Sequence, residues 1–361
     1  MITCGLRRPR PRALRRTRGT SFVGPTLEER ADQLVVVLMN LKNDGGPEPK
    51  RGILPDRWHQ AYEGMLAPLR PDVVAVTEFT FSQTRPGAAR AERRAANRRF
   101  RAAQYVLNSH GFRAAKGQGR NSTGLFIRKE SFLLDATPQR HYTKVYRTPP
   151  THVVMRLPEV PHVPINVLSH HAPYCNPLLN QLEAYELTSV IDKVDAHRDA
   201  QPDLEQAAAW VLGDWNQEPW GPSGIPWNSS EVTDRVHRCH RAVKQSSGPR
   251  GLWVRRTGVD ELLMDVGMHD ACRFAAMHRG QPHALDPTAG FAPGAAGQGG
   301  LSRIDRPYLD GWSVQAVEEV RVLDMTEISD HHALVIVLSR PRLIQALRRD
   351  FPELDPWELV A

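Results

Sequence analysis

Residues 209–219, with the sequence AWVLGDWNQEP, constrain the fold more than any other stretch of this chain. An apolar run stops at Gly213, and Asp214 and Asn216 follow it two residues apart. The run is typical of a buried strand, and the glycine lets the backbone leave the sheet sharply. Because side chains alternate along an extended chain, Asp214 and Asn216 would point to the same side of the strand end. Such a pair is suited to handling a water molecule and a phosphoryl oxygen, although an Asx-rich turn that closes the strand gives the same pattern.

Other apolar runs also end in polar side chains. In chain order these residues are Asn40, Glu78, His170 with His171, Asp305, and Asp330 with His331. An acid such as Glu78 at the end of a buried strand is costly unless it is paired or binds a cation, so a metal ligand and an edge carboxylate both stay open for it. Strand and helix patterns alternate from residue 34 to about 340 without a repeat or a linker, which predicts one α/β domain.

The formal net charge of +7 resides in the N-terminal tail. Residues 1–20 hold seven arginines and no acid, and the rest of the chain balances 40 basic against 40 acidic residues. The tail has too few apolar residues to fold, so we expect residues 1–30 to form a disordered Arg/Pro-rich arm. This arm is either simply solvated or loosely attracted to nucleic acid. It also lacks the apolar core of a secretory signal.

Two further segments depart from the strand and helix patterns. Residues 279–301 are rich in Gly, Ala and Pro and are expected to form an insertion loop, and residues 341–361 to form a C-terminal helical tail. No apolar stretch approaches the roughly 20 residues of a membrane helix. The four cysteines are scattered without a Cys-x-x-Cys pair, which favours a reducing compartment. We therefore expect a cytoplasmic protein without a membrane span, and we expect a monomer.

An arginine-rich helix is predicted after Glu78. Residues 85–101 contain seven arginines and one acid, and four of the arginines share one stripe: Arg90, Arg94, Arg98 and Arg101. Like charges at this spacing repel one another unless an anion compensates them. The stripe is therefore either a solvated face or a contact for a phosphate backbone. Tryptophans near the strand end, Trp215 among them, either stack on bases or anchor loops.

The polar blocks stand in the order LMN, VTEF, SHHAP, LGDWNQ, SRIDR and ISDHH. In this order the chain resembles the endonuclease/exonuclease/phosphatase superfamily, that of deoxyribonuclease I and abasic-site endonucleases. The resemblance covers residues 34–340. It implies a four-layer α/β/β/α sandwich, in which two mixed β-sheets pack face to face and are flanked by helices. Residues 31–340 would then form the catalytic domain of a phosphoester hydrolase. A Rossmann-type sheet is disfavoured because no G-x-G-x-x-G follows the first strand.

The resemblance also implies a role for each block. A Mg²⁺ ion, or Mn²⁺, would bind hard oxygen ligands from Asn40, Glu78 and Asp330. The catalytic residues would be His170 or His171, Asp214, Asn216, Asp305 and His331. Asp214 would orient or deprotonate the water, and Asn216 would hold a non-bridging oxygen. Asp305 would fix the tautomer of His331, which contacts the phosphate or relays a proton. Strand alternation lets only one of the adjacent histidines face the site, and we expect it to be His171.

Two departures separate this chain from abasic-site endonucleases: Lys42 stands where those enzymes usually carry an acid, and HHAPY has histidine where they carry tyrosine. Three functions stay open. A Mg²⁺-dependent nuclease acting on DNA or RNA is favoured by the arginine stripe and the basic tail. A phosphatase or phosphodiesterase acting on a small molecule or inositol lipid is favoured by the neutral body. A catalytically silent binding module is disfavoured because every catalytic position holds a competent residue.

Overall fold

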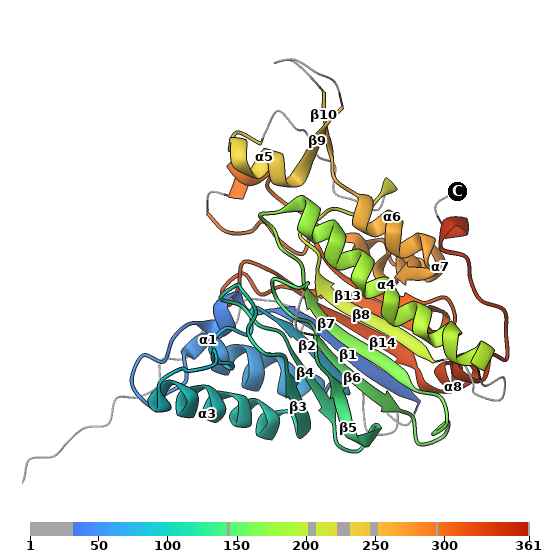
Figure 1. The fold of residues 1–361 in the computed structure, drawn as a ribbon, viewed down its shortest axis with the longest axis horizontal. Helices are drawn as coiled ribbons and strands as arrows, with labels where there is room; N and C mark the ends of the chain where they lie inside the picture. Colours follow the sequence, from blue (N-terminus) through green and yellow to red (C-terminus); the bar gives the residue numbers. More distant parts are fainter. Residues whose placement is uncertain are drawn as a thin grey trace, which may run out of the picture.

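The computed structural model describes residues 32–142, 145–200, 207–221, 232–245, 252–293 and 295–359, so the expected N-terminal arm lies outside the described residues. Two six-stranded sheets form the centre (Figure 1). In spatial order the first contains β13 (Val317–Leu323), β14 (Ala333–Ser339), β1 (Gln33–Asn40), β2 (Val73–Thr77), β4 (Gly124–Arg128) and β3 (Ser109–Arg113). The second contains β11 (Met268–Asp270), β12 (Asp305–Asp310), β8 (Ala208–Asp214), β7 (Ile165–His171), β6 (Thr151–Arg156) and β5 (Leu133–Arg140).

Both sheets are mixed. The pairs β1–β2 and β7–β8 are parallel, and the other pairs are antiparallel. Parallel neighbours bring their carboxyl ends to the same edge, so the polar residues that close β1 and β2 emerge together, as do those that close β7 and β8. A separate two-stranded hairpin is formed by β9 (Ala242–Lys244) and β10 (Trp253–Arg255).

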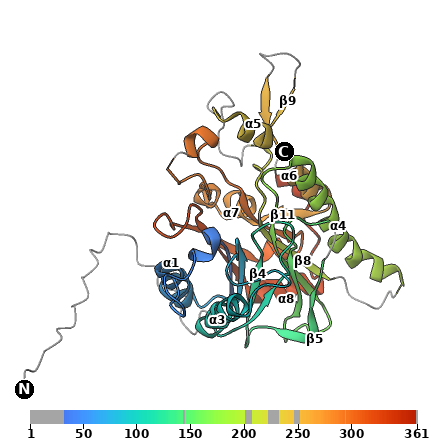
Figure 2. The same ribbon diagram turned by 60° about the vertical axis from the view of Figure 1, so that its left-hand side comes forward.

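The main core lies between the sheets because alternate residues of each strand point inward. In β1, Leu34, Val36 and Leu38 join this core, whereas Val35 and Val37 join a second cluster on the outer face. That second cluster packs under α1 (Asp56–His59), its π-helical continuation Gln60–Leu66, α2 (Ala67–Leu69) and α3 (Arg90–Val106). A third cluster covers the outer face of the second sheet with α4 (Pro177–Ala200) and α6 (Gly258–Asp265). This arrangement confirms the four-layer sandwich, with helices on both outer sides (Figures 1 and 2).

The remaining helices are α5 (Arg235–Arg241), α7 (Ala271–His278) and α8 (Arg340–Arg348), and the 3₁₀ turns are η2 (Lys42–Gly45), η5 (Pro282–Leu285), η6 (Ala295–Gln298), η7 (Ser313–Ala316) and η8 (Pro356–Leu359). The segment at 341–361 is not separate from the domain, because Leu343 and Leu347 of α8 are buried in the main core. The segment at 279–301 contains η5 and η6 and pairs through Ala289 with Ser302 and His331. Among the described residues no helix has the length and apolar character needed to cross a membrane.

Candidate active site

The ends of β1 and β8 meet through two buried side chains, although these strands belong to different sheets. Asn40 closes β1, and its Nδ2 donates a hydrogen bond of 3.1 Å to Oδ2 of Asp214 at the end of β8. His171 closes the neighbouring parallel strand β7 in register with Asp214, and its Nε2 lies 3.6 Å from the same carboxylate oxygen. The strand-end positions predicted from the sequence therefore bring these three side chains into one cluster.

Asp305 and His331 complete this cluster. Asp305 begins β12 directly opposite Asp214 in the antiparallel pairing, and its Oδ2 lies 2.7 Å from Nδ1 of His331. Burial disfavours a charged imidazole, but Asp305 and then Asp214 outweigh it and raise the pKa of His331 to about 10. Burial, reinforced by Asp305, raises the pKa of Asp214 to about 6. The site therefore places an imidazolium between two buried carboxylates.

Asn216 is held beside Asp214 by a tight turn. Its backbone has a φ of 52°, a left-handed conformation that asparagine tolerates better than most residues. Its backbone N–H donates to Oδ1 of Asp214 at 3.0 Å, and its Nδ2 donates to the carbonyl oxygen of Ala172 at 2.8 Å. A carboxamide carries two N–H groups, so a second donor of this side chain stays open for a ligand oxygen.

Glu78 and Asp330 contact neighbouring residues of the turn η2. The carboxylate of Glu78 accepts a hydrogen bond of 2.8 Å from the backbone N–H of Asn43. The adjacent Lys42 places its Nζ 2.8 Å from Oδ2 of Asp330. Residues 42 and 43 lie two and three positions after Asn40, so Glu78 and Asp330 both contact the turn that follows the end of β1.

These donors fit a hard divalent cation. Oδ1 of Asn40 is buried and has no hydrogen-bond partner among the described residues, as expected of an atom that faces a ligand. Glu78 and Asp330 add carboxylates, and Mg²⁺ favours a few such ligands together with waters. The ligand atoms of Asp214, Asp305 and His331 also lie within 4.8 Å of one another. Nδ1 of His331 is already engaged by Asp305, so that second group is better suited to proton transfer than to metal binding.

Comparisons with known proteins find this architecture in solved structures. The abasic (AP) endonuclease LMAP from Leishmania major superposes with a TM-score of 0.53 at 12% identity, covering 89% of this chain and 92% of that one. The chain has the fold of this endonuclease. Two further similar structures are an endonuclease/exonuclease/phosphatase from Bacteroides vulgatus (14% identity, TM-score 0.49, covering 85% and 98%) and a 3′–5′ exonuclease from Neisseria meningitidis (17% identity, TM-score 0.48, covering 85% and 100%). No protein-family model and no curated protein matches the sequence.

His170 does not belong to the cluster around Asp214. It is fully buried on the opposite face of β7, because adjacent residues of a strand point to opposite faces. Its ring centroid lies 5.2 Å from that of Trp215, and its Nε2 lies 3.8 Å from Oε2 of Glu183 on α4. Burial lowers the pKa of His170 to about 3. The catalytic assignment of His170 is therefore corrected to a buried, uncharged core residue.

Trp215 is also a core residue, which contradicts its assignment to substrate binding. Its side chain is fully buried and packs edge-to-face on Tyr308 at a centroid distance of 5.1 Å. Its Nε1 donates a hydrogen bond of 3.0 Å to the carbonyl oxygen of Arg306. Because adjacent side chains point to opposite sides, Trp215 points away from the cluster that contains Asp214. Its ring is enclosed in the core and has no free face on which a base would stack.

Three of the four arginines of the stripe on α3 are exposed to solvent. Arg90, Arg94 and Arg101 are exposed, and Nη2 of Arg98 lies 2.7 Å from both carboxylate oxygens of Glu48. The arginine that turns inward is Arg99, which is buried 3.5 Å from the carboxylate of Asp44. Helical spacing identified a stripe, but only the packing of α3 against η2 decides which arginine faces the interior.

Three residues that the sequence analysis did not assign support the site. Oγ of Ser329 donates to the carbonyl oxygen of Asn40 at 2.8 Å, which fixes the loop before Asp330 to β1. Oγ1 of Thr288 accepts a hydrogen bond of 3.1 Å from the backbone N–H of Asp305. Arg241 of α5 lines a small hollow with Asn216. Ser329 lies inside the ISDHH block, whereas Thr288 and Arg241 follow no recognisable motif.

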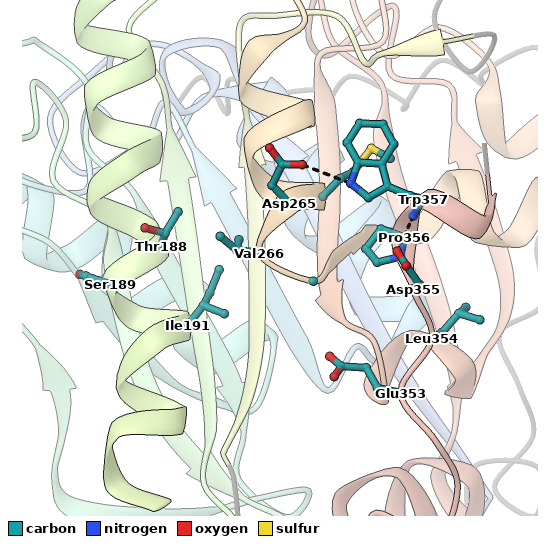
Figure 3. Close-up of a pocket in the computed structure, with 12 residues that line it drawn as sticks. Thr188, Ser189, Ile191, Asp265, Val266, Glu353, Leu354, Asp355, Pro356 and Trp357 are labelled. Atoms are coloured by element: carbon teal, nitrogen blue, oxygen red, sulfur yellow. Dashed lines mark hydrogen bonds between the residues drawn. The ribbon is translucent and has the colours of Figure 1, made fainter. Parts of the chain in front are cut away.

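A separate cavity of about 910 Å³ lies between α4, the end of α6 and the C-terminal segment (Figure 3). Trp357 borders it and donates a hydrogen bond of 3.2 Å from Nε1 to Asp265. None of the predicted site residues lines this cavity, so it is not part of the candidate active site.

Proposed function

We propose that the chain is a metal-dependent phosphoester hydrolase and that it cleaves phosphodiester bonds in nucleic acid. The observation that carries this proposal is the cluster in which Asp214 lies between Asn40, His171 and the Asp305–His331 pair. This set combines a carboxylate for the attacking water with cationic and amide donors for a phosphate. The superfamily fold shared with a protein named as an AP endonuclease supports the same reaction class.

Each side chain has one task in the proposed reaction. Asp214 orients the water and accepts its proton, and Asn40 and the backbone N–H of Asn216 hold this carboxylate in place. His331, oriented by Asp305, contacts the phosphate or passes a proton to the leaving oxygen. The free amide N–H of Asn216 and the imidazole of His171 contact non-bridging oxygens. These contacts neutralise charge at phosphorus as the pentacoordinate transition state forms.

The residues Asn40, Glu78 and Asp330 would hold a divalent cation, with Mg²⁺ as the first choice and Mn²⁺ as an alternative. The bound cation would polarise the phosphoryl group and stabilise the leaving oxygen. In the described part of the chain, Lys42 is the one cationic group paired with these ligands. Its ammonium group contacts the carboxylate of Asp330 and would compete with the divalent cation for it.

A second candidate function is hydrolysis of a small polyphosphorylated molecule. It is favoured by a bounded cavity beside Glu78, which is lined by six basic side chains and would enclose a compact polyanion. The charge-neutral body of the protein points in the same direction, because proteins that bind duplex nucleic acid usually present a broad basic face.

Turnover assays distinguish the proposed activity from a silent binding module. The purified protein is incubated with bis-p-nitrophenyl phosphate, single-stranded and duplex DNA, RNA, and inositol phosphates, each with Mg²⁺, with Mn²⁺ and with chelator. We expect metal-dependent cleavage of a phosphodiester that is lost in chelator. Cleavage of inositol phosphates alone would transfer the assignment to the second candidate, and no turnover of any substrate would refute both.

A further inference from the structure

A basic cavity of about 1010 Å³ lies beside the candidate active site. Its walls come from η2, the loop that follows β2, the N-terminal half of α3 and the segment before β4. The basic side chains that line it are Lys42, Arg57, Arg85, Arg99, Lys116 and Arg120, against the acids Glu48 and Glu92. Such a concentration of cations around one hollow is a binding site for an anion.

This cavity begins at the candidate metal ligands. Its lining residues Lys42 and Asn43 are the two that contact Asp330 and Glu78. On the other side, Thr80 lines the cavity only two residues after Glu78. A ligand in the cavity therefore lies next to the ester bond that the cluster would cleave, so the cavity extends the active site.

Two cations of the cavity, Arg57 and Arg120, are not paired with the acids that line it. Glu48 is already engaged by Arg98 from outside the cavity, at 2.7 Å. The guanidinium groups of Arg57 and Arg120 have no hydrogen-bond or ion-pair partner among the described residues, and both side chains are exposed. Arg99 differs from these two, because its guanidinium group is buried 3.5 Å from the carboxylate of Asp44. The exposed guanidinium groups of Arg57 and Arg120 are therefore the cations that an anionic ligand can reach.

The cavity also offers a stacking surface. Phe81 lines it with 37% of its side chain exposed, and the guanidinium carbon of Arg99 lies 5.3 Å from the ring centroid. An exposed aromatic ring among cations is how proteins bind single strands, because a base stacks on the ring while the cations contact the backbone. The bases of a duplex are already stacked on one another and cannot reach such a ring.

We propose that this cavity holds the nucleotide that flanks the scissile phosphodiester of a single-stranded substrate. The base stacks on Phe81, and its phosphate is contacted by Arg57 and Arg120. This inference rests on the proposed nuclease function and deepens it, because it assigns a preference for single strands over duplex. The exposed stripe of α3 lines no part of the cavity and takes no part in this contact.

The test measures binding in chelator, where no turnover occurs, by fluorescence anisotropy of a short labelled single strand and of its duplex. The variant Arg57→Gln/Arg120→Gln removes two cavity charges, and Arg90→Gln/Arg94→Gln removes two exposed charges of α3 as the matched control. Phe81→Leu removes the ring and leaves the charge unchanged. Thermal unfolding checks that each variant folds.

We expect wild type to bind the single strand more tightly than the duplex, and both cavity variants to weaken single-strand binding by about tenfold. In the double variant, the slope of log K against log salt concentration should become shallower by roughly 0.7 for each lost phosphate contact. The control should stay within about twofold of wild type. Hydrolysis of bis-p-nitrophenyl phosphate should be unchanged in Arg90→Gln/Arg94→Gln, whose two residues do not line the cavity.

Three results would overturn the inference: equal losses in the cavity and control variants, tighter binding of duplex than of single strand, or unchanged single-strand binding in Phe81→Leu. Titration with inositol hexakisphosphate tests whether the cavity binds a small phosphorylated molecule instead of a single strand. If that compact polyanion loses affinity in Arg57→Gln/Arg120→Gln while single-strand binding does not, the cavity serves a small molecule. Failure of the hydrolase proposal is recognised separately, since wild type would then leave bis-p-nitrophenyl phosphate intact whatever the binding results.

Discussion

Asn40 donates a hydrogen bond of 3.1 Å to Asp214, and this bond joins the ends of two strands that belong to different sheets. The buried Oδ1 of Asn40 has no hydrogen-bond partner among the described residues, and Glu78 and Asp330 both contact the turn η2 that follows β1. One amide therefore positions the carboxylate proposed to activate water and also supplies an oxygen proposed to bind the cation.

The variant Asp214→Asn should lose activity while keeping its fold. The amide has nearly the same shape, and its one oxygen can accept a hydrogen bond from either Asn40 or the backbone N–H of Asn216, but it cannot take a proton from water. We expect kcat on bis-p-nitrophenyl phosphate to fall by about 10²- to 10⁴-fold, the usual contribution of a general base. Asp324→Asn, which changes a carboxylate with 79% of its side chain exposed, is the control and should behave as wild type. Equal activity of the two variants would remove Asp214 from the mechanism.

The adjacent histidines provide a matched pair. His171→Gln removes an imidazole that lies 3.6 Å from Asp214 and should lower kcat by roughly 10²-fold, as expected for loss of a donor to the transition state. His170→Gln puts a carboxamide into the apolar space beside Trp215 and should instead lower the melting temperature, with kcat of the folded enzyme close to wild type. The measurements are steady-state kinetics and thermal unfolding on both proteins. The opposite distribution of effects would place His170 in the site.

Lys42 should weaken metal binding. Its ammonium group lies 2.8 Å from Oδ2 of Asp330, where it competes with a cation for this carboxylate. Lys42→Met removes the competing charge, so we expect the Kd for Mn²⁺ to fall by about fivefold, a change of roughly 1 kcal/mol as for a partly exposed ion pair. Calorimetric titration of the protein without substrate measures it directly. Lys50→Met, at an exposed lysine outside the site, is the control, and an unchanged Kd in Lys42→Met would show that Asp330 does not bind the ion.

The buried pair His170 and Glu183 should shape the pH dependence of stability. Burial lowers the pKa of His170 from 6.5 to about 3 and raises that of Glu183 from 4.5 to about 8. Between pH 3 and 6.5 only the unfolded chain protonates His170, so stability rises with pH. Between pH 4.5 and 8 only the unfolded chain loses the Glu183 proton, so stability falls with pH.

These opposing contributions cancel from pH 4.5 to 6.5 and leave a decline from pH 6.5 to 8, with a slope of about 1.4 kcal/mol per pH unit. Glu183→Gln removes the ionisable carboxyl group and should make the decline between pH 6.5 and 8 shallower by this amount, because the raised pKa of His331 contributes a further decline in both proteins. Denaturant unfolding at pH 6.5, 7, 7.5 and 8 compares the two proteins. Parallel stability curves for wild type and Glu183→Gln would contradict the assignment of a protonated Glu183.

The sequence was sufficient to predict the fold and the membership of the central cluster, for a reason that is local. Each apolar run that ends in a polar residue is a strand whose last side chain emerges at the strand end, so Asn40, Asp214 and His171 could be placed at strand ends without coordinates. Strand alternation predicted that only one of His170 and His171 faces the site, and the resemblance indicated His171. The alternation of strands and helices was compatible with the sandwich, and the ordered blocks pointed to it.

Only the tertiary structure decided which charged and aromatic side chains are available to a ligand. Arg98 is held by Glu48, Arg99 is buried beside Asp44, and Trp215 is enclosed in the core, although the sequence left Arg98 and Trp215 as candidates for substrate binding and gave no sign that Arg99 turns inward. Their partners lie between about 50 and 90 residues away along the chain, and burial depends on the packing of whole elements, which no local pattern encodes. Local periodicity therefore determined where the site lies, and long-range packing determined which side chains can serve it.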